Sequence, residues 1–192
     1  MPLHLPGPPS GVPDQVMSKL HAFADGGHFT TQALRAARKE RLTLSTPHQV
    51  FTMGLDDITS GGGLGRAQPV GWRFLIEEGG RLIASTETTL LPDGTHEVTQ
   101  TTEGPFVAGT DEAVKTVRNL PELAADGFEL RLLRIPALYV WALWLHAPAT
   151  DMLVPIAPSP IRKEGRPMPA AAFFADLSAL ASQMTSPPRP SA

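Results

Sequence analysis

Cysteine is absent from this 192-residue sequence. Its absence excludes disulfide bonds, a thiolate nucleophile, and the cysteine ligands of structural zinc and iron–sulfur sites. A chain of this length buries about 70% of the surface that its unfolded state exposes, so one domain needs no cross-link or metal to hold it. We therefore expect a single domain without metal or cofactor. The lack of cysteine also fits a cytoplasmic location.

Long apolar runs and basic runs are missing as well. The most apolar stretch, residues 138–145, is less than half of the roughly 20 residues that a membrane-spanning helix requires. The formal net charge is −3 and no basic run occurs, which gives nucleic-acid binding little electrostatic support. The first residues, 1–13, lack the basic region and apolar core of a secretory signal. The sequence thus predicts neither a nucleic-acid partner nor a membrane partner.

The motifs of several enzyme classes are missing too. Neither HExxH nor GxSxG occurs, so no metalloprotease site and no hydrolase nucleophile elbow are indicated. The glycine-rich segment 61–65 lacks the Lys-Ser/Thr end of a phosphate loop, and Arg66 takes the place of the last glycine of a dinucleotide loop. This segment is interpreted as a hairpin loop, with an anion-binding backbone nest as the alternative. An enzyme is therefore not indicated, although the sequence does not decide the question.

What is present predicts a single α+β domain with the order ααββββαβββα. A bent antiparallel sheet of about six to seven strands should carry helices mainly on one face. The domain is expected at residues 14–184, between a Pro/Gly-rich lead at 1–13 and a tail at 185–192, both predicted to be disordered. Alternating patterns and turn residues predict an antiparallel meander over 70–77, 81–91 and 95–103. The threonines of its second and third strands indicate either an ordinary wet face or the polar wall of a groove.

The stretch 128–156 is predicted to be the spine of the sheet. Residues 138–145 are apolar on both alternating sides and are flanked by prolines, as in a strand covered on both faces. Together with 128–135 and 152–156 they form a three-stranded antiparallel unit. A loop rich in proline follows at 157–169, and helical spacing of apolar residues predicts a last helix over 170–184.

The spine also carries the best candidate site. His146 and Asp151 end facing strands across one loop, so they could approach each other as an acid/base pair or simply close a hairpin. The hairpin interpretation is favoured because nothing nearby in the sequence supplies a nucleophile. The full set of candidate ligand- or partner-binding residues is Trp72, Arg131, Arg134, Trp141, Trp144, His146 and Asp151. None of them is predicted to be catalytic or to bind metal.

Three functions remain open at this point. The first is a non-enzymatic protein-binding or chaperone-like accessory module, whose partner is another protein or a second copy of the chain. The order of elements is similar to the helix–three strands–helix–two strands–helix plan of secretion-chaperone-like domains, which implies pairing with another polypeptide. The second is a binding protein or enzyme for a small apolar ligand, in a pocket between the sheet and the C-terminal helix, with His146 and Arg134 as polar contacts. The third is a structural subunit of a larger assembly, with the N-terminal lead as its docking peptide.

Overall fold

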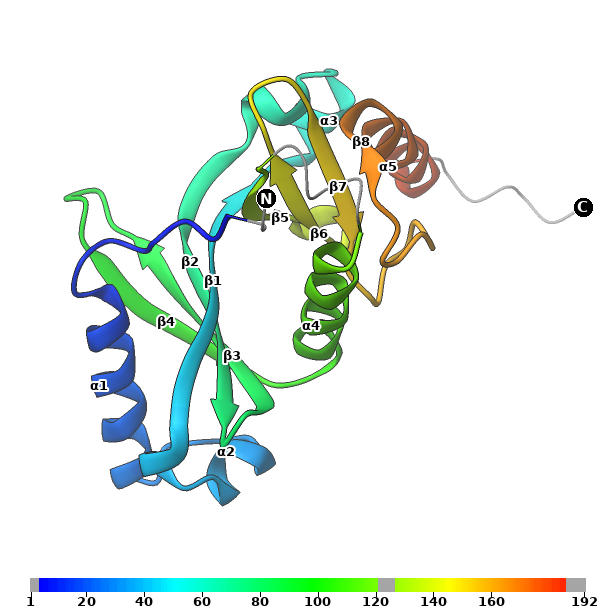
Figure 1. The fold of residues 1–192 in the computed structure, drawn as a ribbon. Helices are drawn as coiled ribbons and strands as arrows, with labels where there is room; N and C mark the ends of the chain where they lie inside the picture. The colour runs from blue at the N-terminus through cyan, green and yellow to red at the C-terminus, as the bar shows by residue number, and fades with distance from the viewer. Residues whose placement is uncertain (1–3, 121–126, 186–192) are drawn as a thin grey trace, which may run out of the picture.

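A single mixed sheet organises the molecule (Figure 1). The structure is a computed structural model, and it describes residues 4–120 and 127–185. Within these residues the sheet has eight strands in the order β4-β3-β2-β1-β5-β6-β7-β8. The strands are β1 (Leu42–Thr52), β2 (Gln68–Glu78), β3 (Arg81–Leu90), β4 (His96–Thr102), β5 (Glu129–Ile135), β6 (Val140–His146), β7 (Asp151–Pro155) and β8 (Met168–Pro169). The α-helices are α1 (Val12–Asp25), α2 (Gln32–Ala36), α3 (Leu55–Thr59), α4 (Pro105–Arg118) and α5 (Ala170–Thr185).

The prediction of a purely antiparallel sheet with six to seven strands is wrong in both respects. β1 and β5 are parallel, with Gln49–Thr52 of β1 paired to Arg131–Arg134 of β5. The chain reaches β5 only after α4, and parallel neighbours need such a long crossover rather than a tight turn. The extra strand, β8, has two residues and pairs with β7, inside the segment 157–169 that was predicted to be a loop.

Two antiparallel meanders, β1–β4 and β5–β8, meet at the parallel pair of β1 and β5, and within each of them the strands pair in sequence order. The antiparallel pairing of β2 with β3 and β4, and that of β5 with β6 and β7, was predicted. β6, which lies between β5 and β7, is buried, with Val140, Leu143 and Leu145 each 0% exposed. Tyr139 is not part of this strand. It follows the 3-10 helix η4 (Pro136–Leu138), has a left-handed backbone (φ 53°, ψ 33°), and is 74% exposed.

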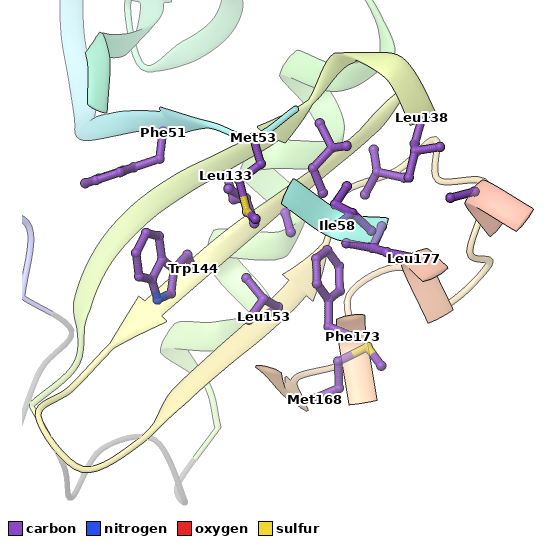
Figure 2. Close-up of a cluster of buried hydrophobic side chains, with 14 residues drawn as sticks. Phe51, Met53, Ile58, Leu133, Leu138, Trp144, Leu153, Met168, Phe173 and Leu177 are labelled. Atoms are coloured by element: carbon purple, nitrogen blue, oxygen red, sulfur yellow. The ribbon is translucent and has the colours of Figure 1, made fainter. Parts of the chain in front are cut away.

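Helices cover both faces of the sheet and not mainly one face as expected, because alternate residues of the buried strands point to opposite sides and both sides are apolar. On β6, Ala142 and Trp144 belong to the apolar cluster under α3 and α5 (Figure 2), whereas Leu143 and Leu145 belong to the cluster under α4. A third cluster joins α1 and α2 to β2 and β3. Figure 1 shows α5 beside α3 and β8 at one end of the sheet, with α1 at the other end.

Two helices differ from the expected pattern. α3 and the 3-10 helix η2 (Gly63–Arg66) occupy the glycine-rich connection between β1 and β2, which was expected to be a plain hairpin loop. α4 begins at Pro105, whose missing N–H costs nothing at a helix start, although the acidic residues Asp111 and Glu112 had indicated Thr110 as its N-terminal cap. Thr110 lies one turn into the helix and is fully buried against the sheet.

The structure near the two ends of the chain can be compared with the lead expected at 1–13 and the tail expected at 185–192. His4 forms a backbone bridge with β5, its N–H donating to the carbonyl of Phe128 (2.8 Å), and α1 starts at Val12, within the lead expected at 1–13. The tail expected at 185–192 lies outside the described residues except for Thr185, as does the helical turn expected at 121–126. The plan of secretion-chaperone-like domains has three strands before its middle helix, whereas four strands precede α4 here.

Candidate functional site

The seven candidate residues lie in three separate places. Trp144, His146, Asp151 and Arg131 gather on the face of the sheet covered by α5. Arg134 and Trp141 lie on the opposite face, under α4, because the β5 and β6 residues of the two groups alternate. Trp72 lies in the third apolar cluster, between the meander and α1.

Trp72 is a core residue. It is 6% exposed, and its backbone N–H donates to Thr88 Oγ1 (3.1 Å). Thr88 and Thr86 are themselves buried, and Thr86 Oγ1 donates to the carbonyl of Gln100 (3.1 Å). Thr86 and Thr88 thus link neighbouring strands from buried positions, whereas Thr89 and Thr99 form an exposed pair (3.0 Å).

The first group centres on the carboxylate of Asp151. Its Oδ1 accepts hydrogen bonds from Trp144 Nε1 (2.7 Å) and from His146 Nδ1 (2.8 Å). The guanidinium of Arg131 lies over the rings of Trp144 (4.8 Å) and Phe51 (5.1 Å), an arrangement that favours the cation. In Figure 2, Trp144 stands at the end of the apolar cluster opposite Leu138, so its indole nitrogen can reach the polar rim.

The approach of His146 and Asp151 is therefore confirmed, and its geometry suits a structural role. The two residues form the last pair of the β6–β7 ladder, so their hydrogen bond closes the hairpin. Because the ionised carboxylate can only accept, Nδ1 of His146 carries a proton in this hydrogen bond. Within the described residues no hydrogen bond connects His146 to a serine, threonine or lysine, so no nucleophile is placed for acyl transfer.

A hollow of about 580 Å³ adjoins Asp151, and we call it the α5 pocket. It lies between the glycine-rich connection and one side of α5, next to Asp151 at the start of β7, and outside the packed interface between the sheet and α5. That interface is filled by Phe173, Leu177 and Ala181, which are at most 1% exposed. The lining consists of small and apolar residues with one carboxylate: Ile58, Gly61, Gly63, Leu64, Gly65, Asp151, Ala170, Ala171, Phe174, Ala175 and Ser178.

The second group is a buried ionic cluster beneath α4. Arg73 on β2 is 0% exposed, and its Nε lies 3.6 Å from Glu87 Oε1. Arg134 Nη1 lies 2.6 Å from Glu87 Oε2, so one carboxylate serves two guanidinium groups. Trp141 covers both arginines, 4.9 Å from Arg73 and 5.4 Å from Arg134, and Phe106 of α4 stacks on it at 4.6 Å.

This cluster fixes α4 on the sheet, and burial lowers the pKa values of Arg73 and of the neighbouring His48. Arg73 Nη1 donates to Thr110 Oγ1 (2.7 Å) and Nη2 to Ser85 Oγ (3.1 Å). Burial lowers the pKa of Arg73 to about 10, with Glu87 opposing the shift. His48, directly opposite Arg73 in the β1–β2 register, is 0% exposed; burial and then the charge of Arg73 lower its pKa to about 3.

A second surface hollow runs along α4, and we call it the α4 groove. Two open hollows of about 570 and 520 Å³ share Pro158 and Glu164 and so form one continuous surface. Gly109 lets α4 approach the proline-rich segment closely, since a Cβ at this position would lie 2.1 Å from the carbonyl oxygen of Ala157. The lining is largely apolar: Pro105, Phe106, Ala108, Gly109, Glu112, Ala113, Thr116, Tyr139, Ala157, Pro158, Ser159, Pro160, Arg162, Glu164 and Gly165.

Three further observations concern metal sites, membrane-spanning helices and similarity to known proteins. Within the described residues no group of three or more histidines and carboxylates could hold a metal ion. Across residues 4–120 and 127–185, no helix is long and apolar enough to cross a membrane. Comparisons of the chain with models of known protein families, with curated proteins and with solved structures give no match.

Sequence reasoning missed Tyr139, Arg73, Glu87 and His48. Tyr139 was taken as one more residue of a buried strand, and nothing in its neighbours signals the left-handed backbone that turns it outward. Arg73 alternates correctly with apolar residues on a strand, which normally places a charge in water. Glu87 stands between Thr86 and Thr88, and such polar neighbours likewise indicate a position that faces water.

Proposed function

We propose that the protein is a non-enzymatic binding module whose α4 groove receives an extended, proline-containing segment of a partner polypeptide. The observation that carries this proposal is Tyr139, which is 74% exposed and stands at the rim of the groove. A large aromatic side chain held in water by a sparsely populated backbone conformation is costly, and such outliers cluster at binding sites.

The chemistry of the lining supports an extended occupant. Tyr139 and Phe106 supply aromatic surface, and three prolines beside them supply flat apolar surface that needs no hydrogen bonds. Proline-rich segments in the polyproline II conformation dock into aromatic-lined grooves because they lose little conformational entropy on binding. The rim carries Glu112, Glu164 and Arg162, so charged neighbours of the docked segment can set its direction.

The ionic cluster gives this groove a rigid base. Phe106 stacks on Trp141, which in turn covers Arg73 and Arg134. Because α4 is tied to the sheet by the bond from Arg73 to Thr110, the groove wall is held before any partner arrives. A preformed surface reduces the ordering cost of binding.

Selection from a random peptide display library tests the proposal. We expect wild-type protein to enrich peptides that contain proline, and we expect their affinity to fall about tenfold or more for Tyr139→Ser, as for loss of an aromatic anchor. Leu90→Ser is the matched control, since Leu90 is also an exposed hydrophobic residue (39%) but lies at the end of β3. Failure to enrich any peptide, or binding that Tyr139→Ser leaves unchanged, would refute the proposal.

The two other functions have less support. A ligand pocket between the sheet and α5 would need space where Phe173 and Leu177 are fully buried. Use of the N-terminal lead as a docking peptide would require release of His4 from β5 and of Leu5 from the cluster under α4.

A further inference from the structure

The α5 pocket is lined mainly by small residues and contains one carboxylate, that of Asp151. Its volume of about 580 Å³ lies within the range of small-molecule sites. Ala170, Ala171 and Ala175 on one side and glycines on the other leave room for a ligand, while Phe174 and Leu64 supply apolar contacts. Asp151 is the one ionisable residue in this lining.

The carboxylate of Asp151 is oriented by its neighbours. Trp144 Nε1 and His146 Nδ1 both donate to Oδ1, which fixes the plane of the group. Within the described residues no hydrogen bond or ion pair engages Oδ2, and the side chain is 29% exposed. A carboxylate held by two donors on one oxygen, with the other oxygen free, is preorganised to accept a charged donor from a ligand.

We propose that the α5 pocket binds a primary ammonium group carried on a short apolar body. The ammonium donates to Asp151 Oδ2 at the rim, and the apolar body lies against Phe174, Leu64 and Ile58. The site is separate from the α4 groove, which lies on the face of the sheet covered by α4. The first turn of α5 adjoins the same pocket and favours an anion, so a carboxylate ligand is the competing outcome.

Three probes of similar size but different charge test the inference. They are 2-phenylethylamine, 2-phenylethanol and phenylacetate, titrated into the full chain near neutral pH while the indole N–H signal of Trp144 is followed by NMR. We expect the amine to bind about tenfold or more tightly than the alcohol, and phenylacetate to bind most weakly. Equal affinity for the three probes, or tightest binding of phenylacetate, would overturn the inference.

Two substitutions distinguish binding of the amine at Asp151 from nonspecific attraction of cations to the protein. Asp151→Asn keeps an oxygen for Trp144 and His146 but removes the charge, and should abolish the preference for the amine over the alcohol. Asp176→Asn is the control, because Asp176 lies on α5 but pairs with Lys163 and does not line the pocket. Retention of the amine preference in Asp151→Asn, or its equal loss in Asp176→Asn, would count against the site. The Tyr139→Ser variant should bind the amine normally, so this test is independent of the α4 groove.

Discussion

His48 should make the stability of the protein depend on pH above the range in which most carboxylates titrate. Its ring is 0% exposed, and Nδ1 lies 2.8 Å from the carbonyl oxygen of Thr46, to which it donates. Nε2 is buried and has no hydrogen-bond partner among residues 4–120 and 127–185, and Arg73 lies opposite on β2. Burial first, and the arginine charge second, lower the pKa from 6.5 to about 3. The folded protein therefore holds this histidine neutral.

The direction and size of the effect follow from this depressed pKa. The unfolded chain takes up a proton on His48 as pH falls through about 6.5, whereas the folded chain does not until about pH 3. Unfolding therefore becomes easier as pH falls through this window. A pH of about 5 lies roughly 1.5 units below the pKa of His48 in the unfolded chain. Protonation of the unfolded chain at that pH therefore lowers the free energy of unfolding by about 2 kcal/mol.

Urea unfolding followed by tryptophan fluorescence measures the effect. The free energy of unfolding of wild type and of His48→Asn is compared between about pH 7.5 and pH 5. Asparagine keeps an N–H donor for Thr46 but does not titrate. We expect wild type to lose about 2 kcal/mol more than the variant over this range, whatever their difference at the higher pH. Parallel pH curves for the two proteins would refute the argument, because carboxylates and the other histidines contribute equally to both.

Two further predictions concern buried contacts. Glu87→Gln leaves the cation of Arg73 buried without its counter-charge, so it should lower the free energy of unfolding by about 3 kcal/mol and the Tm in a thermal scan by roughly 10 °C. The control Glu129→Gln removes a half-exposed ion pair with Arg131 and should cost less than about 1 kcal/mol. Equal effects of the two substitutions would show that the buried cluster is not ionic. Gly71→Ala should cost about 3 kcal/mol in urea unfolding because the new Cβ would lie 1.7 Å from the backbone oxygen of Thr88, and an unchanged midpoint would show that β2 and β3 can move apart there.

Most of the strands were predictable because they carry local signals. The turn at Pro92-Asp93-Gly94 and the apolar spine at 128–156 indicated the antiparallel pairing of β2 with β3 and β4 and that of β5 with β6 and β7. The parallel pairing of β1 with β5 depends on residues far apart in sequence, and no turn motif marks it. β8 was missed because two paired residues in a proline-rich segment leave no periodic pattern.

The candidate site was predicted in part. The pairing of His146 with Asp151 followed from hairpin geometry alone, since both residues flank one loop. The division of the arginines between the two faces also follows from alternation, but the partner of Arg134 is Glu87, 47 residues away on a strand that is not adjacent. Such a contact depends on the bend of the whole sheet, which single-sequence patterns do not specify.

The parallel seam between β1 and β5 makes the two meanders dependent on each other. Four residue pairs join them there, and each meander alone would expose a strand flank with unsatisfied backbone donors and acceptors. Separated halves would be prone to pair with foreign strands. The crossover through α4 keeps the two flanks within reach of one another, so a covalent tether supplies the protection that neither half possesses in isolation.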